Sequence, residues 1–312
     1  MTAGRAGASD QPQLRSRPRG WRAEHVPDRR RAWPELLLHS PTALLGLALL
    51  GALLLAALLA PLIAPDDPTL IDPPQRLLAP SRDHWFGTDD LGRDVFSRVL
   101  YGGRVSLLVG ASVTVLCAGL GSLLGVVAGY YRKLDGLLMR LMDGLLAFPS
   151  ILLAIAVVTS LGANTTSIII ALVLGYTPVV ARLMRGATLA IQGLPYVEGA
   201  RAIGLPDTLL LWRYVLRNAL SPLIVQCAFI AAYAILAEAS LAFLGASGDP
   251  NQPSWGQMLR DGQRLIARAW WIAVPPGVAL FLVVLALNLT GDALRDAFDP
   301  RSGERRGDGV VR

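Results

Sequence analysis

The sequence predicts an all-α integral membrane protein with six transmembrane helices. Of its 312 residues, 53% are hydrophobic and only 17% are charged, a composition too apolar for an ordinary soluble domain. The apolar residues form long runs, and about 20 residues at a rise of ~1.5 Å each cross the ~30 Å hydrocarbon core of a bilayer. Trp33, Trp85, Trp255, Trp270 and Trp271 lie between the runs or at their edges, where indole rings suit the headgroup level. These observations favour membrane spans over buried core helices.

Residues 1–35 are expected to form a basic, disordered cytoplasmic tail. Eight arginines fall within the first 31 residues, with few large apolar side chains among them, so the segment cannot bury enough surface to fold alone. The net charge of +6 could indicate nucleic-acid binding, but arginines placed ahead of a membrane span fit the positive-inside rule better. We therefore expect contact with membrane lipid and no nucleic-acid partner.

The first apolar run, residues 41–64, is interpreted as a retained transmembrane helix. A cleaved secretory signal is the alternative, but 40 residues precede the run, the run exceeds the usual apolar region of a signal, and no clear small-x-small cleavage site follows. Residues 36–103 are assigned to this helix and a periplasmic segment.

Five further apolar runs complete the predicted set of six. They lie near residues 105–130, 144–161, 167–184, 219–244 and 272–290. Residues 104–294 are assigned to a five-helix core and 295–312 to a second cytoplasmic tail. An even number of spans puts both termini on one side, and the excess of Lys and Arg in the connections on that side indicates the cytoplasm. The last outer connection is weakly contrary, because it carries Arg260, Arg264 and Arg268.

Glycines within the second run predict close helix packing. Gly121, Gly125 and Gly129 recur every four residues, a spacing that lets another helix approach closely. A nucleotide-binding loop is the alternative, but no strand precedes these glycines.

No catalytic residue, cofactor site or metal site is predicted in this chain. Cys117 and Cys227 lie inside apolar runs and are interpreted as buried apolar side chains. The histidines at positions 25, 39 and 84 show no ligand spacing, and no HExxH, GxSxG or P-loop motif is found. A secondary transporter is the alternative class, but charged pairs within spans and repeated broken helices are not evident.

The connection formed by residues 182–218 is long, basic and patterned, and it predicts two short helices. Pro195 suits the first position of one helix, and Gly204 suits its end in a left-handed conformation. Pro206 and Asp207 suit the first turn of the second helix, where the carboxylate faces the positive end of the dipole.

The first of these helices is expected to offer a docking surface. Gly199, Ala200 and Gly204 leave its backbone nearly bare, and Glu198 and Arg201 are spaced to pair one turn apart. An amphipathic helix that lies on the inner leaflet is the alternative interpretation of the same pattern.

The residues of this connection carry a family resemblance. The string Glu-Gly-Ala-Arg-Ala-Ile-Gly at 198–204, followed by Asn-Ala-Leu-Ser-Pro-Leu at 218–223, resembles the EAA loop of binding-protein-dependent ABC importer permeases. Gly199 replaces the first alanine of that motif, and Pro206 and Arg217 also depart from the usual pattern. Further motifs resemble the C-type permeases of the dipeptide, oligopeptide and nickel group; they lie at residues 84–98, 147–150, 236–245, 253–259 and 288–300.

The resemblance implies a type I ABC importer (MetI-like) permease fold in a bacterial inner membrane. Such a chain forms half of the translocation pathway and works with a second homologous permease subunit, two cytoplasmic ATPase subunits and an extracytoplasmic substrate-binding protein. ATP and Mg²⁺ then belong to the ATPase subunits. The residues expected to couple this chain to the ATPase are Glu198, Gly199, Ala200, Arg201, Gly204 and Arg213.

Peptides are the expected cargo, and nickel or metal chelates are the alternative. The C-type group serves both classes of solute, and the binding protein is expected to set most of the selectivity. The apolar runs contain no cluster of His, Cys or Met, which favours peptide over bare metal.

The stretch 84–98 is expected to form a scaffold, bonded to itself, beside the outer mouth. Glycines there allow tight turns and the charges are of opposite sign; the residues concerned are Trp85, Gly87, Asp89, Gly92, Arg93 and Asp94. Direct contact with a substrate-binding protein is compatible with the same pattern.

Glu238 is the carboxylate that lies well inside an apolar run. Ionisable groups at membrane depth are costly and often functional, so Glu238 is a possible pathway residue. A glutamate that bonds to a neighbouring helix is the alternative.

Overall fold

The computed structural model describes residues 40–246 and 252–298. Within these ranges the regular secondary structure is helical apart from one isolated bridge between Thr88 and Asp94, and connecting segments such as 64–94 are mostly turns and irregular chain. The predicted tail 1–35 and positions 299–312 of the second tail lie outside the described residues. The α-helices are α2 (Pro41–Leu58), α3 (Ala60–Ile63), α4 (Val95–Tyr130), α5 (Arg132–Leu146), α6 (Ser150–Leu161), α7 (Thr165–Gln192), α8 (Pro195–Ala202), α9 (Asp207–Leu209), α10 (Arg217–Phe243), α11 (Trp255–Gln263) and α12 (Val274–Phe298). A π-helical segment, Leu210–Leu216, joins α9 to α10, and 3-10 turns occupy Pro73–Gln75 and Trp270–Ile272.

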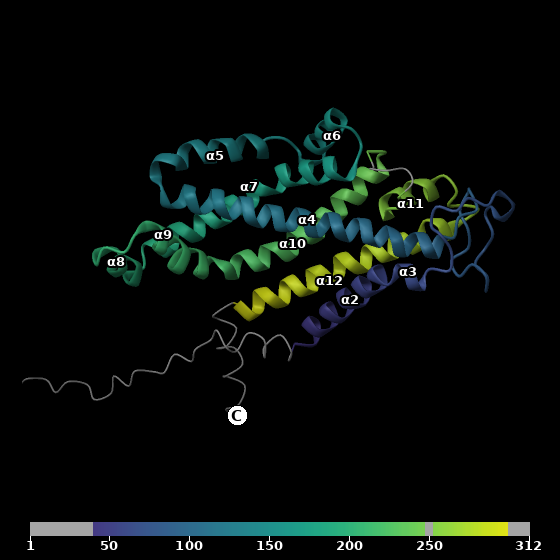
Figure 1. Ribbon diagram of the computed structural model, residues 1–312, viewed down its shortest axis with the longest axis horizontal. Coiled ribbons are helices and arrows are strands. Elements are labelled where there is room, and N and C mark those ends of the chain that lie inside the picture. Colours follow the sequence, from purple (N-terminus) through teal and green to yellow (C-terminus); the bar gives the residue numbers. More distant parts are fainter. Residues whose placement is uncertain (1–39, 247–251, 299–312) are drawn as a thin grey trace, which may run out of the picture.

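The long helices run side by side along the length of the molecule (Figure 1). Helix α4 packs against α7 and α10, and α12 packs between α10 and α2. Helices α8 and α9 lie at one end, whereas α3, α11 and the outer segment 64–94 lie at the other (Figure 1). We call the two ends the α8 end and the outer end; the word outer is a name that follows the topology predicted from the charges.

Five helices among the described residues are long and apolar enough to cross a membrane, and α5 with α6 forms a sixth if the pair counts as one bent span. The run predicted near 144–161 is not one continuous helix: its first residues belong to α5, and α5 and α6 meet at an angle of 88°. Pro149 explains the break, since proline lacks an N–H donor and disfavours helical backbone at the residue before it, Phe148. The 12 residues of α6 span only about 18 Å at ~1.5 Å each.

Helix α4 is longer than the apolar run that predicted it. It begins at Val95, where the Asp94 side chain accepts a hydrogen bond from the Ser97 N–H and caps the helix. The predicted division between residues 103 and 104 therefore falls inside a continuous helix.

The predicted close packing along the second span is confirmed. A Cβ added at Gly121 would lie 2.5 Å from Val180 Cβ, and one added at Gly125 would lie 2.3 Å from the Ala181 carbonyl oxygen. A third added at Gly129 would lie 2.7 Å from Thr188 Cβ. Helix α4 thus approaches α7 at a distance that only glycine permits.

The connection 182–218 contains one separate short helix rather than the two predicted. Its first 11 residues belong to α7, which ends at Gln192. Beyond α8, the chain from Asp207 to Phe243 forms one long helix that includes the π segment. The helix of the fifth span therefore begins at Asp207, 12 residues before the apolar run that predicted it. Pro206 separates this helix from α8.

Candidate functional site

Helix α8 is a short helix with sharp boundaries at the α8 end of the molecule. Pro195 occupies its first turn, as predicted. Its last turn closes with Leu205 N–H donating to the Ala200 carbonyl at 3.2 Å and Gly204 N–H donating to the Arg201 carbonyl at 3.0 Å. This pair of bonds is a Schellman motif, which requires a left-handed residue. Gly204 supplies it with φ +83°, so the predicted end of the helix is confirmed.

The two faces of α8 have different environments. Val197 and Ala200 are buried against the bundle, whereas Glu198, Gly199 and Arg201 are exposed. The prediction that Ala200 belongs to the bare outer surface is therefore wrong, because Ala200 lies three residues after Val197 and shares its face. A Cβ added at Gly199 or Gly204 would meet no atom within 4 Å.

Exposed apolar side chains lie at the end of α8 and in the π segment, which packs against α8. Ile203 is 78% exposed and Trp212, in the π segment, is 73% exposed. We call the exposed set Glu198, Gly199, Ile203, Gly204 and Trp212 the α8 surface. Arg213 is exposed beside it and has no ion pair among the described residues.

Arg201 contacts a different group from the one predicted. Among the described residues no ion pair joins it to Glu198; its guanidinium lies over the Tyr130 ring, 5.6 Å from the centroid. The Tyr130 hydroxyl donates to the Asp207 carboxylate. The end of α4 thus brings an aromatic ring to Arg201, and a cation over a ring is as favourable there as an exposed ion pair.

The contacts that hold α8 in place were not predicted, although Asn218 belongs to the motif at 218–223. Tyr130 and Asp207 connect the end of α4 to the start of the long fifth helix. Asn218 Nδ2 donates to the Tyr214 carbonyl and, at 3.3 Å, to the hydroxyl of Tyr196 in α8. The Tyr-Asp and Tyr-Asn pairs are 77 and 22 residues apart in the chain, so no local spacing could indicate them.

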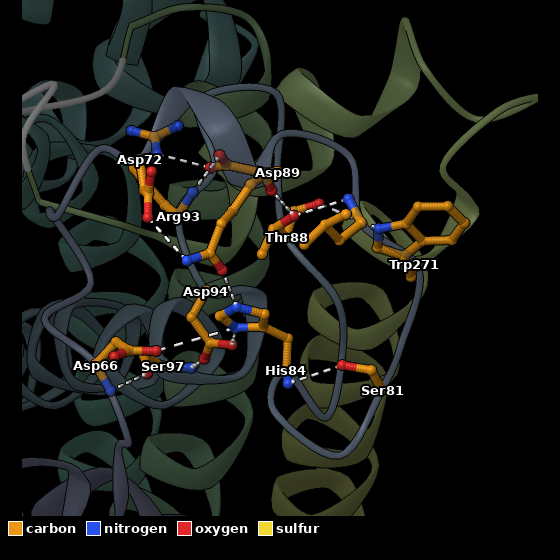
Figure 2. Close-up of polar contacts among 12 residues, drawn as sticks. Asp66, Asp72, Ser81, His84, Thr88, Asp89, Arg93, Asp94, Ser97 and Trp271 are labelled. Atoms are coloured by element: carbon orange, nitrogen blue, oxygen red, sulfur yellow. Dashed lines mark hydrogen bonds and ion pairs between the residues drawn. The ribbon is translucent and has the colours of Figure 1, made fainter.

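At the outer end, Asp89 is the centre of a network of hydrogen bonds (Figure 2). Its Oδ1 accepts from the N–H groups of Leu91 at 2.8 Å and Arg93 at 3.0 Å, and its Oδ2 accepts from Arg93 Nε at 2.6 Å. Arg98 Nε lies 3.5 Å from the same Oδ2. Asp89 and Arg98 are both buried, so each charge is compensated by the other.

Two glycines allow the outer segment to fold against itself. Gly87 has φ +71° and Gly92 has φ +81°. A Cβ at Gly92 would lie 1.8 Å from the Asp72 carbonyl oxygen, and one at Gly87 would lie 2.5 Å from the Leu78 carbonyl oxygen. Trp271 Nε1 donates to the Thr88 carbonyl at 3.1 Å and ties this segment to the turn before α12 (Figure 2).

Trp85 differs from the other predicted scaffold residues. Its ring packs on Phe96 with a centroid distance of 4.9 Å, but the side chain remains 62% exposed. The indole therefore lies at the surface of the outer segment, outside the hydrogen-bonded network.

His84 joins the outer network, although its spacing in the sequence predicted no role. Its Nδ1 lies 3.0 Å from Asp94 Oδ1 and 4.0 Å from Asp66 Oδ2 (Figure 2). Its Nε2 lies 2.5 Å from Gln75 Oε1. Gln75 Nε2 donates to Asp72, so its oxygen faces the histidine and accepts from Nε2–H. One ligand atom from each of Asp66, His84 and Asp94 lies within 4.8 Å of the others, a spacing that could also hold a metal ion.

Glu238 is buried, with 2% of its surface exposed. Ser106 Oγ, from α4, donates to its Oε2 at 2.7 Å. The Ser254 side chain, which caps α11, also bonds to it. Glu238 therefore joins α4, α10 and the start of α11, and access to a pathway would require these elements to separate.

The arrangement defines a helical membrane protein with a short exposed helix at one end and a hydrogen-bonded segment at the other. Sequence comparison gives its family. Residues 121–304 match the family described as the binding-protein-dependent transport system inner membrane component, and residues 30–80 match the N-terminal transmembrane domain of oligopeptide transport permease C. The chain belongs to this family of transport permeases, and the predicted fold class is confirmed.

Several curated proteins are similar along most of their length. A Brucella suis protein named as a candidate peptide transport system permease is 47% identical over 82% of this chain and 87% of its own. The dipeptide transport system permease protein DppC of Alkalihalophilus pseudofirmus is 40% identical over 83% and 86%. The di/tripeptide permease of Pseudomonas aeruginosa is 42% identical over 84% and 89%.

Proposed function

We propose that this chain is one of two permease subunits of an ATP-driven peptide importer and that the α8 surface seats on a cytoplasmic ATPase subunit. The observation that carries the proposal is the α8 surface itself. It combines open glycine backbone with an isoleucine and a tryptophan that are more than 70% exposed. Exposed charged residues lie beside them, and an apolar patch with a polar rim favours contact with another molecule. Family membership supports the importer class.

The orientation proposed follows from charge. The α8 end carries Arg201, Arg213 and Arg217, and the start of α5 adds Arg132 and Lys133. An excess of basic residues favours the cytoplasmic face of an inner membrane. Both termini then lie in the cytoplasm, and the outer segment 64–94 faces an extracytoplasmic binding protein.

The partners proposed are a second homologous permease subunit, two ATPase subunits and the binding protein. ATP and Mg²⁺ would bind to the ATPase subunits, and this chain would contribute no cofactor of its own. Peptide cargo is proposed because the relatives described above are named for peptides, dipeptides and tripeptides. These names do not favour the nickel alternative.

The test of docking uses glycines that tolerate a side chain in the isolated subunit. Gly199→Trp places an indole on the α8 surface where an added Cβ meets no atom, so the chain should fold normally. Gly136→Trp, in α5, is the matched control, since Gly136 is equally open. We expect Gly199→Trp to lose co-purification of the ATPase subunits and peptide uptake, and Gly136→Trp to retain both.

Two further variants separate backbone strain from docking. Gly204→Trp should abolish transport through both effects, whereas Gly204→Asn should be mild because asparagine tolerates left-handed backbone. Glu198→Ala should weaken transport only slightly unless the carboxylate meets a cation on the ATPase. If Gly199→Trp and Gly204→Trp both keep their ATPase partners and wild-type uptake, α8 is not the coupling element.

The proposal also predicts where hydrolysis occurs. The purified chain should neither bind nor hydrolyse ATP, and substrate-stimulated hydrolysis should appear when the cognate ATPase subunits are added. Hydrolysis by this polypeptide alone, in a preparation free of other ATPases, would contradict the assignment.

A further inference from the structure

A cavity of about 850 Å³ opens at the outer end of the molecule. It lies between the chain that follows α3, the first turns of α4, the start of α7 and the residues just before α11. Its volume falls within the range of about 300 to 1,000 Å³ for small-molecule sites. We call it the outer cavity.

Arg104 is the cation that lines this cavity, together with Tyr101. Its guanidinium lies over the Tyr101 ring, 5.7 Å from the centroid. No carboxylate of the described residues forms an ion pair with Arg104. The ring holds the guanidinium without using its planar set of N–H donors, which match the two oxygens of a carboxylate.

Acidic groups line the same cavity. Asp66 and Asp67 belong to the segment after α3, and neither pairs with Arg104. The N–H and hydroxyl of Thr69 both donate to Asp67 Oδ1, at 2.8 and 2.6 Å. These two bonds hold the Asp67 carboxylate in place after α3. Among the described residues, the cavity therefore presents a cation and two carboxylates that do not pair with it, although Asp66 also lies 4.0 Å from His84 Nδ1.

Separated charges of opposite sign complement a zwitterion. A short peptide carries an ammonium group at one end and a carboxylate at the other, whereas an apolar solute or a bare cation would leave one sign of charge uncompensated. We propose that the outer cavity receives the charged ends of an incoming peptide, with Arg104 binding its carboxylate and Asp66 and Asp67 facing its ammonium group. This inference rests on the proposed function, because it concerns the cargo of the same importer.

The first experiment measures uptake of radiolabelled L-alanyl-L-alanine by the complete transporter in proteoliposomes, with saturating binding protein. Arg104→Gln should lower uptake at least about tenfold, since a lost hydrogen bond between charged groups is worth that much. Asp67→Asn keeps the acceptor for Thr69 but removes the charge, and should lower uptake about threefold. Arg82→Gln is the matched control, because Arg82 is an exposed outer arginine that does not line the cavity. It should leave uptake unchanged.

A second experiment distinguishes charge from structure on a single folded protein. Arg104→Cys is modified with either a 2-aminoethyl or a 2-sulfonatoethyl methanethiosulfonate, and the unsubstituted chain controls for reaction at Cys117 and Cys227. The cationic adduct should restore several-fold more uptake than the anionic one. Equal uptake with the two adducts would mean that position 104 acts through packing alone and would overturn the inference.

The outcomes separate this inference from the proposed function. If the wild-type complex takes up no peptide, the proposed function fails and the inference fails with it. If the wild-type complex takes up the dipeptide and Arg104→Gln matches it, only the inference about the cavity is overturned.

Discussion

At the scale of single residues, the outer segment depends on positions where no side chain fits. Gly92 has φ +81° and faces the Asp72 carbonyl, so alanine there would suffer both left-handed strain and steric overlap. The strain alone costs about 1 to 2 kcal/mol. Gly119 offers the opposite case, because a Cβ there meets no atom within 4 Å.

We therefore expect Gly92→Ala to destabilise the outer segment by about 2 kcal/mol or more, and Gly119→Ala to have almost no effect. Limited proteolysis of the detergent-solubilised protein measures this, with cleavage between residues 64 and 94 as the signal. A Gly92→Ala protein as resistant as the wild type would show that the segment does not pack against Asp72 as described.

Glu238 allows a second test at this scale. Glu238→Gln keeps an oxygen acceptor for Ser106 and should cost about 1 kcal/mol or less. Glu238→Leu leaves the Ser106 and Ser254 hydroxyls without this partner and should cost about 2 kcal/mol or more. Unfolding in mixed detergent micelles measures both variants. Equal stability of the two would contradict a structural role, and loss of uptake by a fully stable Glu238→Gln protein would favour a role in the pathway.

At the scale of elements, α5, the first helix of the bent pair, is held to α7 by two ion pairs. Asp135 binds Arg185 through two bonds, at 2.5 and 2.7 Å. The Arg185 side chain is 35% exposed and the Asp135 side chain is 27% exposed. Asp143 binds Arg182 through one bond at 2.6 Å, and both of these side chains are more than half exposed. Two-point geometry and lower exposure favour the first pair.

We expect a double-mutant cycle of Asp135→Ala and Arg185→Ala to give a coupling energy of about 1 kcal/mol, and a cycle of Asp143→Ala and Arg182→Ala to give less than about 0.5 kcal/mol. Unfolding of each variant in mixed micelles supplies the four free energies of each cycle. The order of the two coupling energies is the critical result, and its reversal would mean that α5 is attached mainly near the bend.

At the scale of the whole molecule, the charge distribution predicts the orientation in the membrane. Arg76→Cys and Arg268→Cys should react with an impermeant thiol reagent from outside intact cells, since both positions are exposed at the outer end. Gly193→Cys, next to α8, should react only after the membrane is opened. Gln257, in α11 on the same connection as Arg268, is unsuitable for labelling because its side chain is buried. Labelling of Gly193→Cys in intact cells would contradict the predicted topology.

Several properties follow from local patterns, and the sequence alone determined them. Apolar runs of membrane length predicted the helical membrane class, the four-residue spacing of Gly121, Gly125 and Gly129 predicted close packing, and Gly204 predicted the end of α8. Each of these three properties depends on the hydropathy or the backbone freedom of residues that are close in the chain, and both follow from residue type alone.

Other properties were decided only by the tertiary structure. The pairing of Arg201 with Tyr130, the place of His84 between Asp94 and Gln75, and the burial of Ala200 all involve groups brought together from distant parts of the chain. The same holds for the outer cavity, whose lining comes from four separate segments. Hydropathy reports whether a residue prefers apolar surroundings, but the partner of a charged or aromatic group depends on which helices pack together, and no local spacing encodes that choice.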